Sequence, residues 1–212
     1  MEGEPKSLSI SFLFVLFIKR SFSFFSKNGV PCLFSTLLKL QLAKKTKVKI
    51  NIKKFFIMKI NYLNIYNNLV KLTRNKELYK DFKNQDTFSD RLIFFLLHFA
   101  FFLKIYKENN DKELLQEIYD QTFRQVELSV REIGYGDQSI NKKMKDYLNL
   151  FYGMIDKIHN WENLSLESRR KLLVNFLDNA VNVDYLVDYF EKYRLNLLNN
   201  TLNSHIKGVV KH

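Results

Sequence analysis

Glycines, arginine and acidic residues occur close together in the stretch REIGYGDQSINKKMKDYLNLFYG, residues 131–153. Its centre, Gly-Tyr-Gly-Asp at 134–137, could cradle a phosphate, hold a ligand or only turn the chain. A third glycine, a preceding strand and a following Gly-Lys-Ser/Thr are missing, which excludes a dinucleotide fingerprint and a P-loop. The glycines therefore predict a corner between two helices, with Gly134 left-handed and Asp137 or Ser139 capping the second helix.

Histidine is the next side chain that could carry chemistry. His98 lies inside the apolar run LIFFLLHFAFFL and could ligate haem or a metal, but a lone histidine on an apolar face is more often a hydrogen-bonded core residue. No HExxH, paired ExxH or GxSxG motif occurs, and Cys32 is the one cysteine. We therefore expect no metal, no cofactor and no enzyme, with a small helical enzyme using His98 and the corner carboxylates as the weakest alternative.

The elements that must position these residues are predicted to be helices. Both prolines precede residue 58, and apolar residues after it recur with a helical period. The expected fold is all-α, a single compact domain of about six helices in a bundle-like array. Its buried central helix is the one that contains residues 92–103, because that run is apolar at every position except His98. The other helices are expected at about 59–80, 112–133, 140–160, 166–179 and 183–200.

Single residues predict how these helices end and pack. Thr87 is expected to cap the central helix, with Asp90 as its capping-box partner three residues later. Ile133 is expected on the inner face of the helix that it ends. Gly153 lies inside a predicted helix, where glycine costs about 1 kcal/mol relative to alanine. It would let another backbone approach closely, either a packed helix of this chain or a partner.

The net charge of +12 is distributed unevenly along the chain. Residues 1–57 carry 11 Lys and Arg against 2 acids, which leaves 23 bases and 20 acids for residues 58–212. A basic helical nucleic-acid-binding protein is therefore the less favoured alternative, and we expect no specific nucleic acid partner. The segment 1–57 is expected to be an unstructured extension, a targeting segment or an over-extended gene start. Residues 58–212 form the predicted helical domain.

Two stretches resemble the ubiquinol-cytochrome c chaperone family of bacteria and mitochondria: DTFSDRLIFFLLH at 86–98, and SVREIGYGDQSINKKMKDYLNLFYG at 129–153. Members of that family share a start that leads to Leu-His, a glycine turn, a Met-Lys pair and a Tyr-Gly. The matching residues here are Asp86, Phe88, Arg91, Leu97, His98, Arg131, Glu132, Gly134, Gly136, Asp137, Met144, Lys145, Tyr152 and Gly153. The resemblance spans about residues 78–161. Val130 and Met154 depart from it, since leucine and arginine are usual there.

This resemblance implies an assembly chaperone, not an enzyme, for ubiquinol-cytochrome c reductase, which is the cytochrome bc1 complex or respiratory complex III. It implies that the protein binds newly made cytochrome b. It also implies two further partners, a small assembly factor and the ribosome. The expected place is the cytoplasmic side of a bacterial inner membrane, or the mitochondrial inner membrane or matrix, as a peripheral protein on an anionic membrane surface.

The residues expected to bind the partner lie in the two matching stretches. They are Asp86, Arg91, Arg131, Glu132, Tyr135, Asp137, Lys143, Lys145 and Tyr152. Glycines are expected to shape the turn and the helix contact, at Gly134, Gly136 and Gly153. His98 is expected to be a buried polar residue.

Overall fold

The computed structural model describes residues 62–80, 82, 87–107, 112–177 and 182–207, without the side chain of Gln138. All of them belong to the unit Ile60–His212. The expected extension over residues 1–57 and the expected partner residue Asp86 lie outside the described residues, so both stay predictions. Within the described ranges every regular element is a helix, which confirms the all-α prediction.

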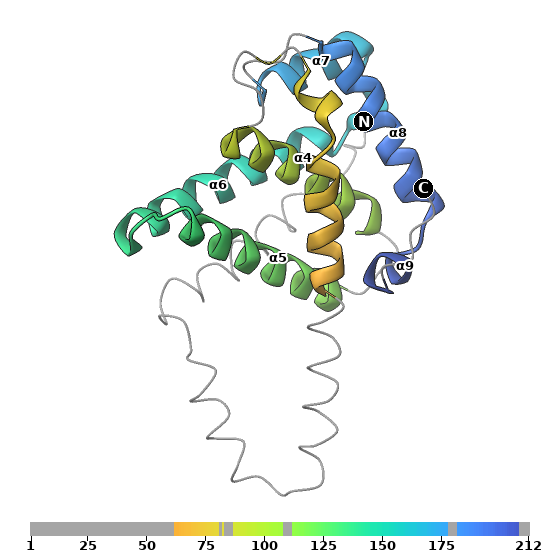
Figure 1. Cartoon of the computed structure of the whole chain (residues 1–212). Helices are drawn as coiled ribbons and strands as arrows, with labels where there is room; N and C mark the ends of the chain where they lie inside the picture. Colours follow the sequence, from red (N-terminus) through yellow and green to blue (C-terminus); the bar gives the residue numbers. More distant parts are fainter. Residues whose placement is uncertain (1–61, 81, 83–86, 108–111, 178–181, 208–212) are drawn as a thin grey trace, which may run out of the picture. The chain divides into compact units, whose positions relative to one another are not determined.

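Seven α-helices and two 3-10 helices make up the described part of the chain. An α-helix over residues 62–73 comes first. The elements that follow are η1 (Lys76–Tyr79), α4 (Phe88–Tyr106), α5 (Lys112–Glu132), α6 (Asp137–Ile158), η2 (Trp161–Asn163), α7 (Leu166–Val174), α8 (Val183–Asn199) and α9 (Leu202–Lys207) (Figure 1).

Two expected helices end earlier than their patterns predicted. The first stops near residue 73 because Asn75 starts a separate element: its side chain accepts a hydrogen bond from the Glu77 amide at 3.1 Å, which caps η1. Asn75 competes with the helix in this way because its short polar side chain can satisfy nearby amides. The helix α7 stops at Val174 instead of about residue 179.

The helix α4 is the centre of the fold, as its sequence predicted. Twelve of its 19 residues are buried, and it packs most extensively against α6 and α8 (Figure 1). Phenylalanines on opposite sides of α4 make these contacts, since Phe99 stacks on Phe151 of α6 and Phe101 stacks on Phe190 of α8, each at 5.3 Å between ring centroids. Burying one such side chain contributes about 1.5–3 kcal/mol.

The beginning of α4 is fixed by the predicted cap. Thr87 Oγ1 accepts a hydrogen bond from the Asp90 amide at 3.2 Å, and the Thr87 hydroxyl donates to the Asp90 carboxylate at 2.6 Å. The carboxylate therefore bonds the hydroxyl of the capping residue, whereas a glutamate in a full capping box reaches its backbone amide.

The helices α5 and α6 follow each other as a pair joined by a short corner, which lies at the outer end of the pair in Figure 1. The Tyr119 and Tyr152 hydroxyls share a hydrogen bond at 3.1 Å across this pair. Over the described residues, no helix has both the length and the apolar content needed to cross a membrane.

Candidate functional site

The corner between α5 and α6 is built by its two glycines. Gly134 has a φ of +100°, and its amide donates to the Arg131 carbonyl at 2.9 Å. Gly136 is the N-cap of α6 with a φ of −70°, and no side chain caps that helix. The expected caps are therefore wrong: Asp137 is already the first residue of α6, and the Ser139 hydroxyl donates to the Gly136 carbonyl at 2.7 Å.

Arg131 joins the two sides of this corner. Its Nε and Nη2 donate to one carboxylate oxygen of Glu127, at 3.1 and 2.8 Å, and its Nη1 donates to Asp137 at the start of α6. The hydrogen bond that Arg131 donates to Glu127, followed by the one that it donates to Asp137, raises the pKa of the Arg131 guanidinium. Arg131 and Asp137 are exposed and Glu127 is half-buried, so the contact orients the corner more than it stabilises the fold.

The surface of the corner mixes apolar and charged side chains. Tyr135 is 38% exposed, and the Lys143 ammonium lies 4.3 Å from its ring centroid, in a cation–π contact. Glu132 and Lys145 are exposed. Ile133 is 49% exposed, so its expected inward orientation is wrong, because α5 ends at Glu132 and leaves Ile133 on the turn.

Two of the predicted site residues lie away from the exposed corner surface. Tyr152 is half-buried, and burial raises the pKa of its hydroxyl, which bonds Tyr119 on α5. It therefore holds α5 against α6. At Gly153 a Cβ atom would meet no described neighbour within 4 Å, so no described helix packs closely there, and the alternative of a partner contact at Gly153 stays a prediction.

Arg91 lies in a different place, at a groove formed by the helix over residues 62–73, the start of α4 and the second half of α5. The groove has a volume of about 180 Å³. Its lining is apolar and aromatic apart from Arg74, Arg91 and two hydroxyl residues, and consists of Tyr66, Val70, Thr73, Arg74, Phe88, Arg91, Leu92, Phe95, Val126 and Ser129. No sequence pattern reveals this groove, because its walls come from segments about 20 to 60 residues apart.

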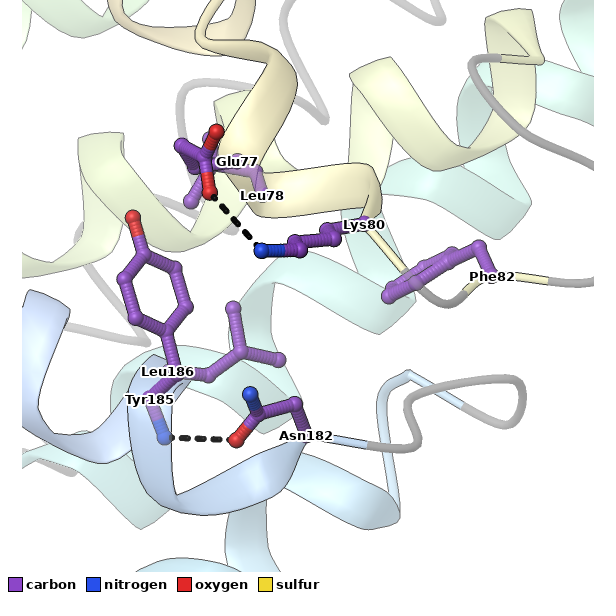
Figure 2. Close-up of a pocket in the computed structure, with 7 residues that line it drawn as sticks. All are labelled: Glu77, Leu78, Lys80, Phe82, Asn182, Tyr185 and Leu186. Atoms are coloured by element: carbon purple, nitrogen blue, oxygen red, sulfur yellow. Dashed lines mark hydrogen bonds and ion pairs between the residues drawn. The ribbon is translucent and has the colours of Figure 1, made fainter.

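A smaller hollow of about 80 Å³ lies between η1 and the start of α8 (Figure 2). Glu77 and Lys80 form an ion pair at 3.9 Å on one side, and on the other Asn182 caps α8 by accepting a hydrogen bond from the Tyr185 amide at 3.2 Å. This volume is well below the roughly 300 Å³ of small-molecule sites. The hollow is therefore too small for such a ligand, and it lies where the ends of two helices meet.

His98 is completely buried in α4 and both of its ring nitrogens are occupied. Nδ1 is 2.6 Å from the Phe94 carbonyl and must donate to it, so Nε2 accepts from the Tyr189 hydroxyl at 2.8 Å. Burial lowers the pKa of the imidazole to about 4. A ring held in this way has no lone pair left for a metal, and no group of three metal-ligating side chains occurs elsewhere among the described residues.

Substitution is expected to lower the free energy of unfolding at one corner glycine and not at the other. Gly134→Ala should lower the free energy of unfolding by about 1–2 kcal/mol, because an L side chain is strained at positive φ. Gly136→Ser is the matched control: its φ suits any residue, and serine supplies the missing cap, so no loss is expected. Urea unfolding followed by circular dichroism measures both, and equal losses would contradict the assigned conformations.

Comparison with known proteins places these features in a family. The sequence model of the Ubiquinol-cytochrome C chaperone family matches residues 80–189, which include α4, the corner and the beginning of α8. Among solved structures, that of the Cbp3 homolog from Brucella abortus is similar, with a TM-score of 0.61 and 23% identity over 79% of this chain and 96% of that chain. At this identity the likeness concerns the fold. No curated protein sequence matches the chain.

Proposed function

Because this chain belongs to the ubiquinol-cytochrome c chaperone family, we propose that it assists assembly of the cytochrome bc1 complex by binding newly made cytochrome b. The family match over residues 80–189 is the observation that carries this proposal. The all-helical fold, similar to that of the Cbp3 homolog, supports it. The role is one of binding and release, not of catalysis.

Two surfaces are candidates for the contact with cytochrome b. The first, the corner surface, consists of Arg131, Glu132, Tyr135, Asp137, Lys143 and Lys145. It suits a partner contact because aromatic, cationic and anionic groups lie exposed together at the outer end of α5 and α6 (Figure 1). The second is the groove beside Arg91. Tyr152 holds α5 against α6 through Tyr119, about four helical turns from the corner surface.

We further propose a peripheral position at the membrane in which the bc1 complex is assembled. A small partner assembly factor and the ribosome are proposed as additional contacts, which would bring the chaperone to cytochrome b as it is made. Exposed lysines near the corner, such as Lys142 and Lys145, would each contribute about 1 kcal/mol on an anionic lipid surface.

Deletion of the gene is expected to lower the amount of assembled bc1 complex, measured by the haem difference spectrum of cytochrome b and by native gels of membranes. Affinity-tagged full chain should co-purify cytochrome b in the complemented strain. Reversing two corner charges, with Lys143→Glu and Lys145→Glu, should reduce that capture. The double reversal Lys171→Glu/Lys192→Glu, at two exposed lysines of α7 and α8, is the matched control. Normal bc1 levels after deletion, or no captured cytochrome b, would refute the proposed function.

A further inference from the structure

We propose that the groove between the helix over residues 62–73, α4 and α5 binds one large apolar side chain of the partner polypeptide and a carboxylate beside it. The proposal rests on the proposed function for the identity of that partner. The chemistry of the occupant follows from the size, charge and rigidity of the groove itself.

The volume of the groove sets the size of the occupant. Small-molecule and cofactor sites usually enclose about 300–1,000 Å³, whereas this groove has about 180 Å³. It is therefore too small for a drug-sized ligand and large enough for one aromatic or long aliphatic side chain. Because Phe88, Phe95 and Val126 line it, the occupant should be apolar.

The charge of the groove determines which chemical group of the partner lies next to its apolar side chain. Arg74 is exposed and lines the groove, where its guanidinium supplies positive charge beside the apolar walls. Arg91 also lines the groove but takes part in another interaction within the chain. Guanidinium groups bind carboxylates through two parallel hydrogen bonds, which adds orientation to charge complementarity. A partner segment that carries an aspartate, a glutamate or a terminal carboxylate beside its apolar side chain fits this lining.

The walls of the groove are held in place before any partner binds. The Tyr66 and Ser129 hydroxyls share a hydrogen bond at 2.9 Å, which ties the helix over residues 62–73 to α5. The Tyr66 ring also packs on Phe95 of α4, at 5.4 Å between centroids. Three helices are thus joined around one tyrosine, and a preformed site of this kind loses little free energy to ordering when it binds.

A small probe tests the chemistry without the natural partner. N-acetyl-L-phenylalanine carries one aromatic ring and one carboxylate, and N-acetyl-L-phenylalaninamide lacks only the charge. Titrated into the isotope-labelled full chain, the acid should shift the methyl resonances of Leu92 and Val126. The amide should bind about 1.5- to fivefold more weakly, the range for an exposed ion pair.

Three variants locate the binding of the probe. The variant Arg74→Gln should weaken binding of the acid to the level of the amide. Val70→Phe should abolish binding of both, because the new ring fills the groove; circular dichroism and thermal melting establish that this variant folds. Arg124→Gln, on α5 but outside the groove lining, should leave both affinities unchanged. Equal binding of acid and amide, shifts confined to other surfaces, or an effect of Arg124→Gln as large as that of the groove variants would overturn the proposal.

Capture of cytochrome b separates a failure of this inference from a failure of the proposed function. If wild-type chain captures cytochrome b and the groove variants capture it equally well, the groove proposal is wrong and the function stands. If the probe binds as expected but no cytochrome b is captured, the function is wrong and the groove stands. Should the groove variants lose binding to phosphatidylglycerol vesicles while acid and amide bind alike, a lipid is the occupant and the proposal is overturned.

Discussion

Trp161→Ala is expected to lower the free energy of unfolding by about 3–5 kcal/mol, a large part of the stability of a domain this size. The reason is the position of Trp161 where η2 meets α4, α7 and α8. Its side chain is completely buried, its ring contacts Phe101 edge-on at 5.1 Å, and its Nε1 donates to Glu191 at 2.8 Å. Removal of the indole leaves a cavity, and the Glu191 carboxylate loses the hydrogen bond that it accepts from Trp161.

Urea unfolding followed by far-ultraviolet circular dichroism measures this loss, since the chain has no second tryptophan to report by fluorescence. Trp161→Phe should cost less, because most of the apolar volume remains. Leu166→Ala is the matched control, because Leu166 is 52% exposed and nearby in the sequence. A loss below about 1 kcal/mol for Trp161→Ala would show that the site relaxes, contrary to a close-packed junction.

The stability of the fold should also fall as the pH is lowered from 7 to 5, by about 2 kcal/mol from His98 alone. Its pKa is about 4 in the folded protein and 6.5 without burial. Between these values the unfolded chain binds the proton and the folded chain does not, so the contribution is complete above about pH 6.5 and decreases toward pH 4. Each unit of pH in this window corresponds to about 1.4 kcal/mol.

Denaturant unfolding at a series of pH values measures this slope. The variant His98→Gln is the critical comparison, because an amide does not titrate. It should be less stable at pH 7, since Tyr189 and the packing against Phe190 lose their partner, but its stability should depend much less on pH between 6.5 and 5. A slope equal to that of the wild type would assign the acid sensitivity to carboxylates instead.

The central helix and the corner were predictable because local sequence determines them. The run around His98 is apolar on every side, so only a buried helix can accommodate it, and Gly134 is where a left-handed residue ends α5. The boundary at Asn75 was missed because its side-chain bond to the Glu77 amide competes with the continuing helix. Ile133 was misplaced for a similar reason, since the pattern of α5 continues one residue beyond its last turn.

The groove and the role of Tyr152 could not be predicted, because both depend on helices that are distant in the sequence. Tyr152 fits the exposed motif around the corner, and only its hydrogen bond with Tyr119, 33 residues away, places it inside. The lining of the groove likewise combines Arg74, Phe88 and Val126, which share no spacing. A hydropathy pattern reports which face of a helix is buried, but not which helix covers it.

The order in which the chain is made has a consequence for α4. Tyr189 of α8 follows His98 by 91 residues, and the rings that cover this side of the helix belong to the same late segment. At a synthesis rate of about 5–20 residues per second, that delay is about 5–20 s. During this time the phenylalanine-rich helix has left the ribosome while the residues that cover this side of it have not yet been made, so we expect the nascent protein to need general chaperones before it is folded.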